Sequence, residues 1–291
     1  MLFRSKAQRR GLSLAYQGGD QLYPGYAAEN KLANEFSAGL QHRLANNVDI
    51  GVQVWARLKI FLNSDQDLAR GYWQPFIQWT VNSHSSVRTG FRQDGLDYAR
   101  SDYFDYTGPG FFLQWRQRLA GRWTVMPTLA IGQNRFQRTA QQLLGNTPGL
   151  IMEAVRQQDD VTTAGLYSEW LWRSLLLSLH YQWQQNHSNS YGYNYDRHGL
   201  TVMFTEQIGA FFVRGYMTWQ KKNYRDALLP FLPIELDTEQ EENNFYVLDV
   251  SRDLVPDVTA VVRWAWYKNE SPWANLYYKK NLLQTFLEWH F

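Results

Sequence analysis

Hydrophobic and polar residues alternate along most of this chain, and the alternating segments recur about every twenty residues. The clearest segment covers residues 48–60. One set of its alternate positions is apolar and the other is mostly polar: Val48, Ile50, Val52, Val54, Ala56, Leu58 and Ile60 against Gly51, Gln53, Trp55, Arg57 and Lys59. Successive side chains of a strand point to opposite faces. The pattern therefore predicts β-strands with one apolar and one polar face.

The connections between these segments alternate in length. Short turns are expected at residues 46–47, 82–85, 120–122, 172–174, 207–209 and 253–257. Longer loops are expected at residues 94–110, 138–160, 186–194 and 225–242, among others. About fourteen strands with this rhythm are typical of a transmembrane β-barrel, which has short periplasmic turns and longer extracellular loops. We predict an all-β, closed antiparallel transmembrane barrel over residues 9–291, preceded by a periplasmic segment at residues 1–8.

A soluble β-sandwich is the alternative explanation of the alternation, with the apolar face packed in a core. A sandwich does not require long and short loops to alternate, and it would place fewer tryptophans on the apolar face. Two prolines fit poorly inside predicted strands, because each removes a donor from the hydrogen-bond ladder. We expect Pro75 and Pro127 to mark bulges or strand boundaries.

Composition supports the barrel. Aromatic residues make up 16% of the chain, with 13 Trp and 18 Tyr, yet the mean hydropathy is −0.50. Tryptophan and tyrosine gather at membrane interfaces. No run approaches the roughly 18 apolar residues of a helical span. The absence of cysteine rules out disulfides and zinc–thiolate sites. A formal charge of +2 gives no reason to expect nucleic acid as a partner.

The polar face of the predicted strands carries an excess of cations. The residues expected to line a lumen are Arg57, Lys59, Arg88, Arg92, Arg116, Arg118, Arg197, Arg214, Arg263, Glu169 and Glu288. Such a face cannot form a dry core, because buried unpaired charge is costly, so it predicts a water-filled pore. The excess would concentrate anions, which predicts a porin-like channel for small polar or anionic solutes. Alternatively, these arginines pair with carboxylates and only stiffen the wall.

Catalytic and cofactor sites find little support. The six histidines show no metal-ligand spacing, and no P-loop or dinucleotide fingerprint is present. Outer-membrane phospholipases are similar barrels in which His and Ser lie two residues apart, whereas here His187 and Ser188 are adjacent. We expect no enzyme activity, no metal and no cofactor, and we keep an outer-membrane lipid hydrolase as a remote alternative.

The chain ends on an alternating segment that includes Leu287, Trp289 and a terminal Phe291. This ending resembles the last strand of bacterial outer-membrane barrels, where the terminal aromatic residue is part of an assembly signal. The resemblance implies a Gram-negative outer-membrane protein, with the barrel assembly machinery, membrane lipid and lipopolysaccharide as partners. Residues 1–10 lack the apolar segment of a signal peptide, so we expect a mature chain or the barrel part of a longer precursor.

Residues 186–198 and 269–281 show a second resemblance. Each runs from Asn through Ser to a tyrosine and charged residues before an alternating strand. These segments resemble the last hairpins of fourteen-stranded barrels fused to periplasmic tetratricopeptide repeats, such as the surface lipoprotein assembly modifiers. The resemblance implies an alternative function: export of a polysaccharide or surface lipoprotein, together with a periplasmic subunit or a fused repeat domain. No repeat domain is present in the 291 residues.

Overall fold

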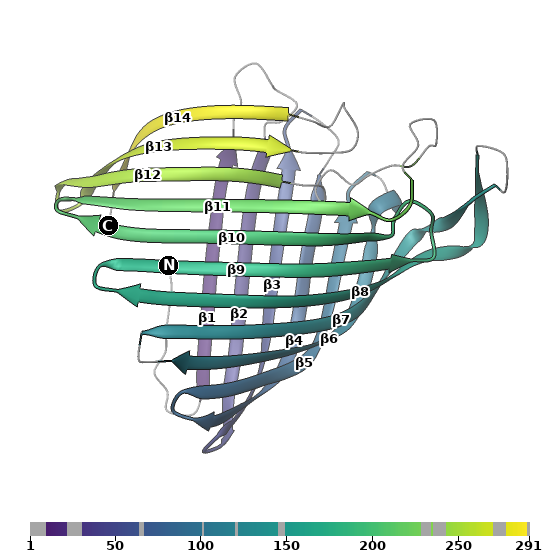
Figure 1. Ribbon diagram of the computed structural model, residues 1–291, viewed down its shortest axis with the longest axis horizontal. Coiled ribbons are helices and arrows are strands. Elements are labelled where there is room, and N and C mark those ends of the chain that lie inside the picture. The colour runs from purple at the N-terminus through teal and green to yellow at the C-terminus, as the bar shows by residue number, and fades with distance from the viewer. Residues whose placement is uncertain are drawn as a thin grey trace. The chain divides into compact units, whose positions relative to one another are not determined.

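The computed structural model describes residues 10–21, 31–63, 67–100, 102–119, 122–144, 149–227, 234, 243–269 and 278–289. These ranges hold fourteen β-strands and one 3₁₀ turn, η2 (Asp102–Phe104) (Figure 1). The strands are β1(Arg10–Gln21), β2(Lys31–Ala45), β3(Val48–Phe61), β4(Leu68–Asn82), β5(Ser85–Tyr98), β6(Tyr106–Leu119), β7(Trp123–Leu143), β8(Leu150–Trp172), β9(Leu175–Ser188), β10(Tyr195–Ile208), β11(Phe211–Tyr224), β12(Asn243–Val255), β13(Val258–Asn269) and β14(Tyr278–Trp289). No helix among the described residues is long and apolar enough to cross a membrane.

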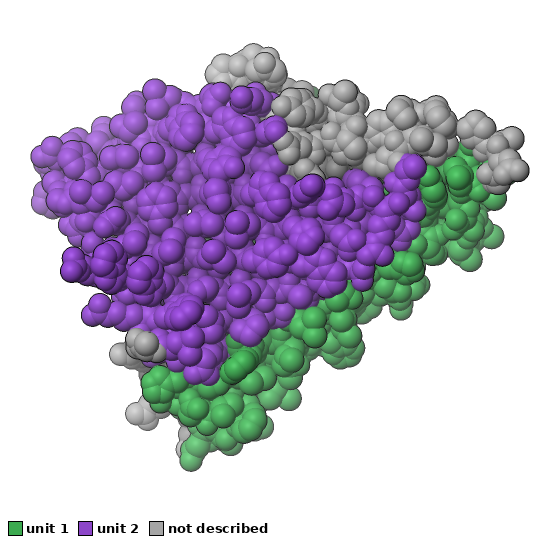
Figure 2. All heavy atoms as spheres, in the orientation of Figure 1, with its two compact units in different colours: residues 1–115, 129–162, 186–193 green, residues 116–128, 163–185, 194–291 purple. Residues whose placement is uncertain are grey.

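The strands form one antiparallel sheet whose order is the order of the chain, from β1 to β14. The predicted all-β class, the antiparallel arrangement and the strand number are confirmed. Short turns fix the register between neighbours, as in the β2–β3 hairpin, where Leu40 lies opposite Val52. By contacts, the chain divides into two compact units (Figure 2). Unit 1 is residues 1–115, 129–162 and 186–193, and unit 2 is residues 116–128, 163–185 and 194–291.

Large apolar side chains are exposed on one face of the sheet in each unit. In unit 1, Ile50, Val54 and Leu58 follow one another on β3 with 36%, 38% and 43% of their surface exposed. In unit 2, Leu283 and Leu287 on β14 are 74% and 48% exposed. Contiguous apolar surface of this size is unfavourable in water and is expected to contact other apolar groups. For a sheet of this class, lipid acyl chains are those groups. We call this the apolar face and its opposite the polar face.

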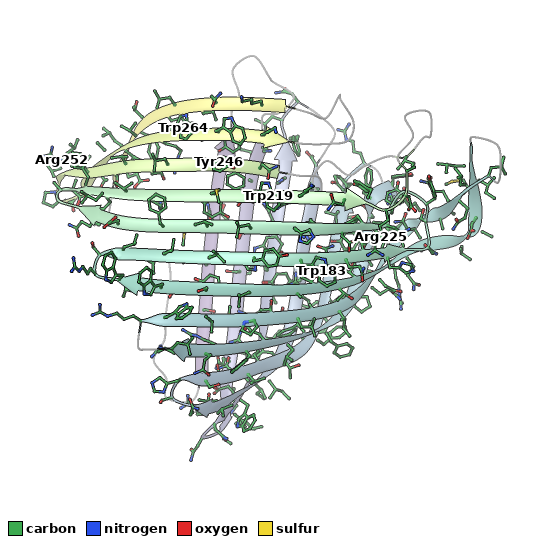
Figure 3. The ribbon with its side chains drawn as sticks, in the orientation of Figure 1. Trp183, Trp219, Arg225, Tyr246, Arg252 and Trp264 are labelled. Carbon is green, nitrogen blue, oxygen red and sulfur yellow. The ribbon has the colours of Figure 1, made fainter. Side chains whose placement is uncertain are left out.

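Tryptophans mark where the apolar face approaches the short turns. The exposed members are Trp79 and Trp115 in unit 1 and Trp123, Trp170 and Trp172 in unit 2. Other aromatic residues lie farther from the short turns on β9, β11 and β12 of unit 2, among them Trp183, Trp219 and Tyr246 (Figure 3). Amphipathic rings gather at the two membrane–water interfaces.

The apolar face of β7 shows where the membrane-spanning segment ends. Leu129 and Ile131 are exposed apolar side chains, whereas the next residues on that face, Gln133 and Arg135, are polar. Gln133 donates to the Oδ1 atom of Asp160 on β8 at 2.9 Å. Beyond these residues the β7–β8 hairpin continues outside the membrane, so the predicted loop at residues 138–160 is wrong. The lipid-facing stripe ends there, because the positions that continue it on β7 are Gln133, Arg135, Gln137 and Thr139. Scattered apolar side chains such as Ile151, Met152 and Val155 remain exposed on β8.

The predicted loop at residues 94–110 is also mostly strand. β5 runs to Tyr98 and β6 begins at Tyr106, so the Gly108–Pro109–Gly110 sequence lies inside β6. Gly110 fits because a Cβ atom there would lie 2.8 Å from the Ile131 carbonyl oxygen of the neighbouring strand. Glycine here reflects close approach of two backbones and not a turn.

Pro75 and Pro127 both lie inside strands, so their interpretation as strand boundaries is wrong. Pro75 also causes no bulge: it lies opposite Val52, and the β4–β5 register is the same before it (Trp73 opposite Gln93) as after it (Phe76 opposite Gly90). A Cβ atom on Gly90 would lie 2.1 Å from the Pro75 carbonyl oxygen. The close approach of β5 at Gly90 accommodates the proline within a continuous register.

We predict that Gly90→Ala lowers the free energy of unfolding by about 1–3 kcal/mol, because the added methyl group overpacks against backbone. Gly95→Ala on the same strand is the matched control, since its Cβ atom would lie 3.8 Å from the nearest atom, the Tyr106 carbonyl oxygen. Urea unfolding in lipid vesicles measures both. Equal stability of the two variants would contradict this account of Gly90.

Candidate functional site

The polar face of unit 1 carries a row of charged and amide side chains across β2 to β5. The Arg43 Nε atom donates to Asp49 Oδ1 at 3.4 Å, and Asp49 lies opposite Gln78 in the register. Arg88 donates to Gln78 Oε1 from Nε at 3.0 Å and from Nη2 at 2.7 Å. The guanidinium of Arg88 also lies 4.2 Å from the centre of the Phe76 ring. Two side chains of the neighbouring strand β4 therefore hold the predicted lumen residue Arg88 against the sheet.

Arg92 is restrained in a similar way. Its Nε and Nη2 atoms each donate to a carboxylate oxygen of Asp94 at 2.7 Å. The guanidinium lies 4.0 Å from the centre of the Tyr72 ring, and Tyr72 stacks on Trp55 with the ring centres 5.6 Å apart. A bidentate ion pair combined with a cation–π contact gives a long side chain a defined position.

Arg57 lies in a more cationic setting. In the register it is opposite Glu35 on β2 and opposite Arg70 on β4. Arg57 and Arg70 are both exposed, whereas Lys59, two residues along β3, is 7% exposed. Two exposed guanidinium groups on adjacent strands beside one carboxylate leave this part of the polar face positively charged.

Unit 2 contains the most tightly built charged group of the polar face. Asp249 on β12 lies opposite Arg214 on β11 and Arg263 on β13. Its Oδ2 atom accepts from Arg214 Nη2 at 2.7 Å and from Arg263 Nη2 at 2.8 Å, and Oδ1 accepts from Arg263 Nε at 2.7 Å. The carboxylate side chain is 5% exposed, against 54% and 33% for the two arginines. One buried anion thus orients two cations that remain open to solvent.

The other predicted lumen residues of unit 2 are arranged less tightly. Arg197 donates from Nη2 to Gln184 Oε1 at 2.6 Å, and Glu169 accepts from the Tyr167 hydroxyl at 2.7 Å. The remaining three are exposed: Arg116, Arg118 and Glu288. Several of these arginines pair with carboxylates, as expected if they stiffen the wall. The pairing still leaves unbalanced positive charge, as expected if they attract anions, so neither interpretation is excluded.

A further cluster of unit 1, which lies beyond the apolar band and which we call the outer cluster, was not predicted from the sequence. At its centre is Arg138 on β7, which is 9% exposed and donates from Nε to Gln157 Oε1 at 2.7 Å. Four rings surround the guanidinium with their centres 4.2–5.2 Å away: Tyr103, Phe104, Phe136 and Tyr193. These rings come from η2, from β7 and from the segment after β9. Cation–π contacts thus join three segments that are distant in the chain.

Asp159 on β8 extends the outer cluster beyond the apolar band. It is 5% exposed, and it accepts from Gln157 Nε2 at 2.9 Å and from Asn186 Nδ2 at 2.8 Å. Burial raises the pKa of Asp159 above its usual 3.8, against the opposing effect of hydrogen bonds from Ser188, Asn186 and Gln157 and of the charge on Arg138. A buried carboxylate surrounded by donors fixes the start of the segment that follows β9.

The residues considered for catalysis also belong to this region. Ser190 Oγ accepts from the Gln141 amide at 3.0 Å, and Ser188 Oγ accepts from the Ser190 amide at 3.0 Å. Ser188 is buried while His187 is exposed, so the adjacent pair points to opposite faces of the strand. The serine hydroxyls hold the backbone in place. Only the unusual density of Asn, Ser and Gln at residues 182–190 could have signalled this cluster in the sequence.

The predicted assembly signal lies at the end of β14. Leu287 is 48% exposed and lies opposite Ala260. Trp289 is the last residue of the strand and lies opposite Val258. Phe291 and the predicted periplasmic segment at residues 1–8 lie outside the described residues.

Comparison with solved structures identifies the fold. The structure of CdiB from Acinetobacter baumannii matches with a TM-score of 0.54 and 8% identity over 98% of this chain and 58% of that chain. A mutant of the ferric enterobactin receptor PfeA from Pseudomonas aeruginosa, in complex with enterobactin, matches with a TM-score of 0.50 and 12% identity over 92% of this chain and 46% of that chain. No protein-family model and no curated protein matches the sequence.

The fold is that of the bacterial outer-membrane β-barrels, and this class places the chain in the outer membrane. The chain spans about half the length of the two proteins above, with 58% and 46% of them covered. At these identities the likeness concerns the fold. The finer resemblance to barrels fused to repeat domains stays a prediction.

The raised pKa of Asp159 predicts a specific pH dependence. When the pKa of a carboxyl group is higher in the folded state than in the unfolded state, the group favours folding most at a pH below its pKa in the unfolded state. This contribution is lost as the pH rises through the pKa in the folded state. We expect the stability of the wild type relative to Asp159→Asn to increase as the pH is lowered from 7 to 4. The difference between the free energies of unfolding of the two proteins, determined at each pH, tests this expectation. A difference that stays constant or shrinks on acidification would contradict the assignment.

Proposed function

We propose that the chain forms an outer-membrane channel through which small polar or anionic solutes pass, and that it performs no catalytic step. The observation that carries the proposal is the arginine that reaches solvent on the polar face: Arg57 and Arg70 in unit 1 and Arg214 in unit 2 are exposed, and Arg263 in unit 2 is partly exposed. In a barrel of this class the polar face meets water in the lumen. Fixed cations there raise the local concentration of anions.

The fixed positions of several arginine side chains also support the passage of solutes through the lumen. Rings and carboxylates hold Arg88 and Arg92 against the sheet, so they contribute charge without filling the lumen. A translocation barrel that exports a polysaccharide or a lipoprotein is the alternative. Copurification of a periplasmic subunit, or a repeat domain encoded in the same gene, would favour that alternative.

The test is a reversal-potential measurement in planar bilayers under a potassium chloride gradient. We expect a preference for chloride, because the exposed charge of the polar face is cationic. Arg57→Glu should lower the chloride-to-potassium permeability ratio by about twofold, since it converts the Arg57–Arg70 pair into a neutral one.

Arg156→Glu serves as the control, because Arg156 is an exposed cation on the opposite face, beyond the apolar band. Its replacement should leave the ratio unchanged. Potassium preference in the wild type would refute the proposal. Equal effects of the two substitutions would show that the polar face does not determine selectivity.

A further inference from the structure

The Arg214–Asp249–Arg263 group of unit 2 leaves directed donors facing solvent. Asp249 engages Nη2 of Arg214 and both Nε and Nη2 of Arg263. Within the described ranges, these are the hydrogen bonds that the two guanidinium groups make, so Arg214 Nε and Nη1 and Arg263 Nη1 keep donors for another acceptor. Asp249 holds two cations in place with a single negative charge, which leaves a net positive group. Fixed, directed N–H donors of this kind suit the oxygens of a carboxylate better than a spherical ion.

Aromatic rings lie farther along the same three strands and on the same face. Tyr216 stacks on Phe245 with ring centres 5.3 Å apart and planes 21° apart, and Phe245 stacks on Tyr267 at 5.9 Å and 24°. We call these three residues the aromatic row. Tyr216 is two residues from Arg214, and Tyr267 is four from Arg263, which places the rings about 7–13 Å along the strands from the arginines. Tyr216 remains 37% exposed.

The combination of donors and rings restricts the ligand. Aromatic side chains that face the water of a lumen leave apolar surface uncovered, which costs free energy unless a solute covers it. A simple anion such as chloride would use the arginines alone. A solute with a carboxylate at one end and an apolar ring at the other would use both groups.

We propose that this face of unit 2 is a binding subsite for small aromatic carboxylates, with Arg214 and Arg263 binding the carboxylate and the aromatic row contacting the ring. Asp249 is the positioning residue that orients the two guanidinium groups. The inference rests on the proposed channel function for its physiological meaning, and it names the class of solute that the channel passes.

The test uses benzoate and acetate as probes, since they share the carboxylate and differ in the ring. Isothermal titration of the folded protein in detergent micelles measures binding, and reduction of the chloride current in planar bilayers measures occupancy of the lumen. We expect the wild type to bind benzoate about five- to tenfold more tightly than acetate, a margin typical of an added aromatic contact. Benzoate should reduce the chloride current at concentrations where acetate does not.

Two substitutions separate the two parts of the subsite. Arg214→Gln should weaken both probes by about tenfold, because it removes a charge-assisted hydrogen bond. Phe245→Leu should weaken benzoate about fivefold and leave acetate unchanged, because it removes the central ring while keeping an apolar side chain. Arg252→Gln is the matched control: Arg252 is an exposed cation on the opposite face of β12, at its turn end (Figure 3). It should alter neither affinity.

The outcomes separate this inference from the proposed function. Equal binding of benzoate and acetate, or an equal loss of both probes in Phe245→Leu, overturns the subsite even if the channel prefers chloride. Preferential benzoate binding in a barrel that prefers potassium refutes the anion channel and leaves the subsite intact. An effect of Arg252→Gln as large as that of Arg214→Gln shows that overall charge accounts for the binding, which also overturns the subsite.

Discussion

Hydrocarbon offers no hydrogen bonds, so every backbone N–H and C=O group inside a membrane needs a partner within the protein. An antiparallel sheet whose strands pair in chain order meets this need with short connections. The same constraint explains why the register stays continuous past Pro75, where a slip would turn the lipid-facing side chains toward water. Glycine at position 90 lets β5 approach the proline closely enough to keep that register.

The lipid-facing requirement leaves the alternate positions free to be polar, and there the arginines gather. Their placement follows a common scheme in both units, in which a carboxylate, an amide or a ring on the same or a neighbouring strand holds the guanidinium. Arg92 lies between Asp94 and Tyr72, and Asp249 holds both Arg214 and Arg263. These contacts keep long side chains close to the sheet. The polar face is therefore a structured cationic surface, and both functional proposals depend on it.

Strand identity and face were predictable because lipid imposes a period of two on segments such as residues 48–60. The outer strand ends were not, because beyond Ile131 the regular alternation of apolar and polar residues stops while the ladder continues. Alternation also placed Arg57, Arg214 and Arg263 on the polar face. Their partners depend on register between strands, which no pattern along the chain reveals. The outer cluster around Arg138 joins residues as far apart in the sequence as Tyr103 and Tyr193, so only the folded chain shows it.

Every conclusion about this protein depends on one arrangement, in which one face of each strand meets acyl chains while the other meets water. The chain contains no cysteine, so single cysteines can be introduced along β3 at Val52, Gln53, Val54, Trp55, Ala56 and Arg57 without background. Labelling by a charged, membrane-impermeant maleimide in lipid vesicles that contain the folded protein reports which positions meet water. We expect fast labelling at positions 53, 55 and 57 and protection at positions 52, 54 and 56. Uniform labelling, or protection of the odd positions instead, would contradict it.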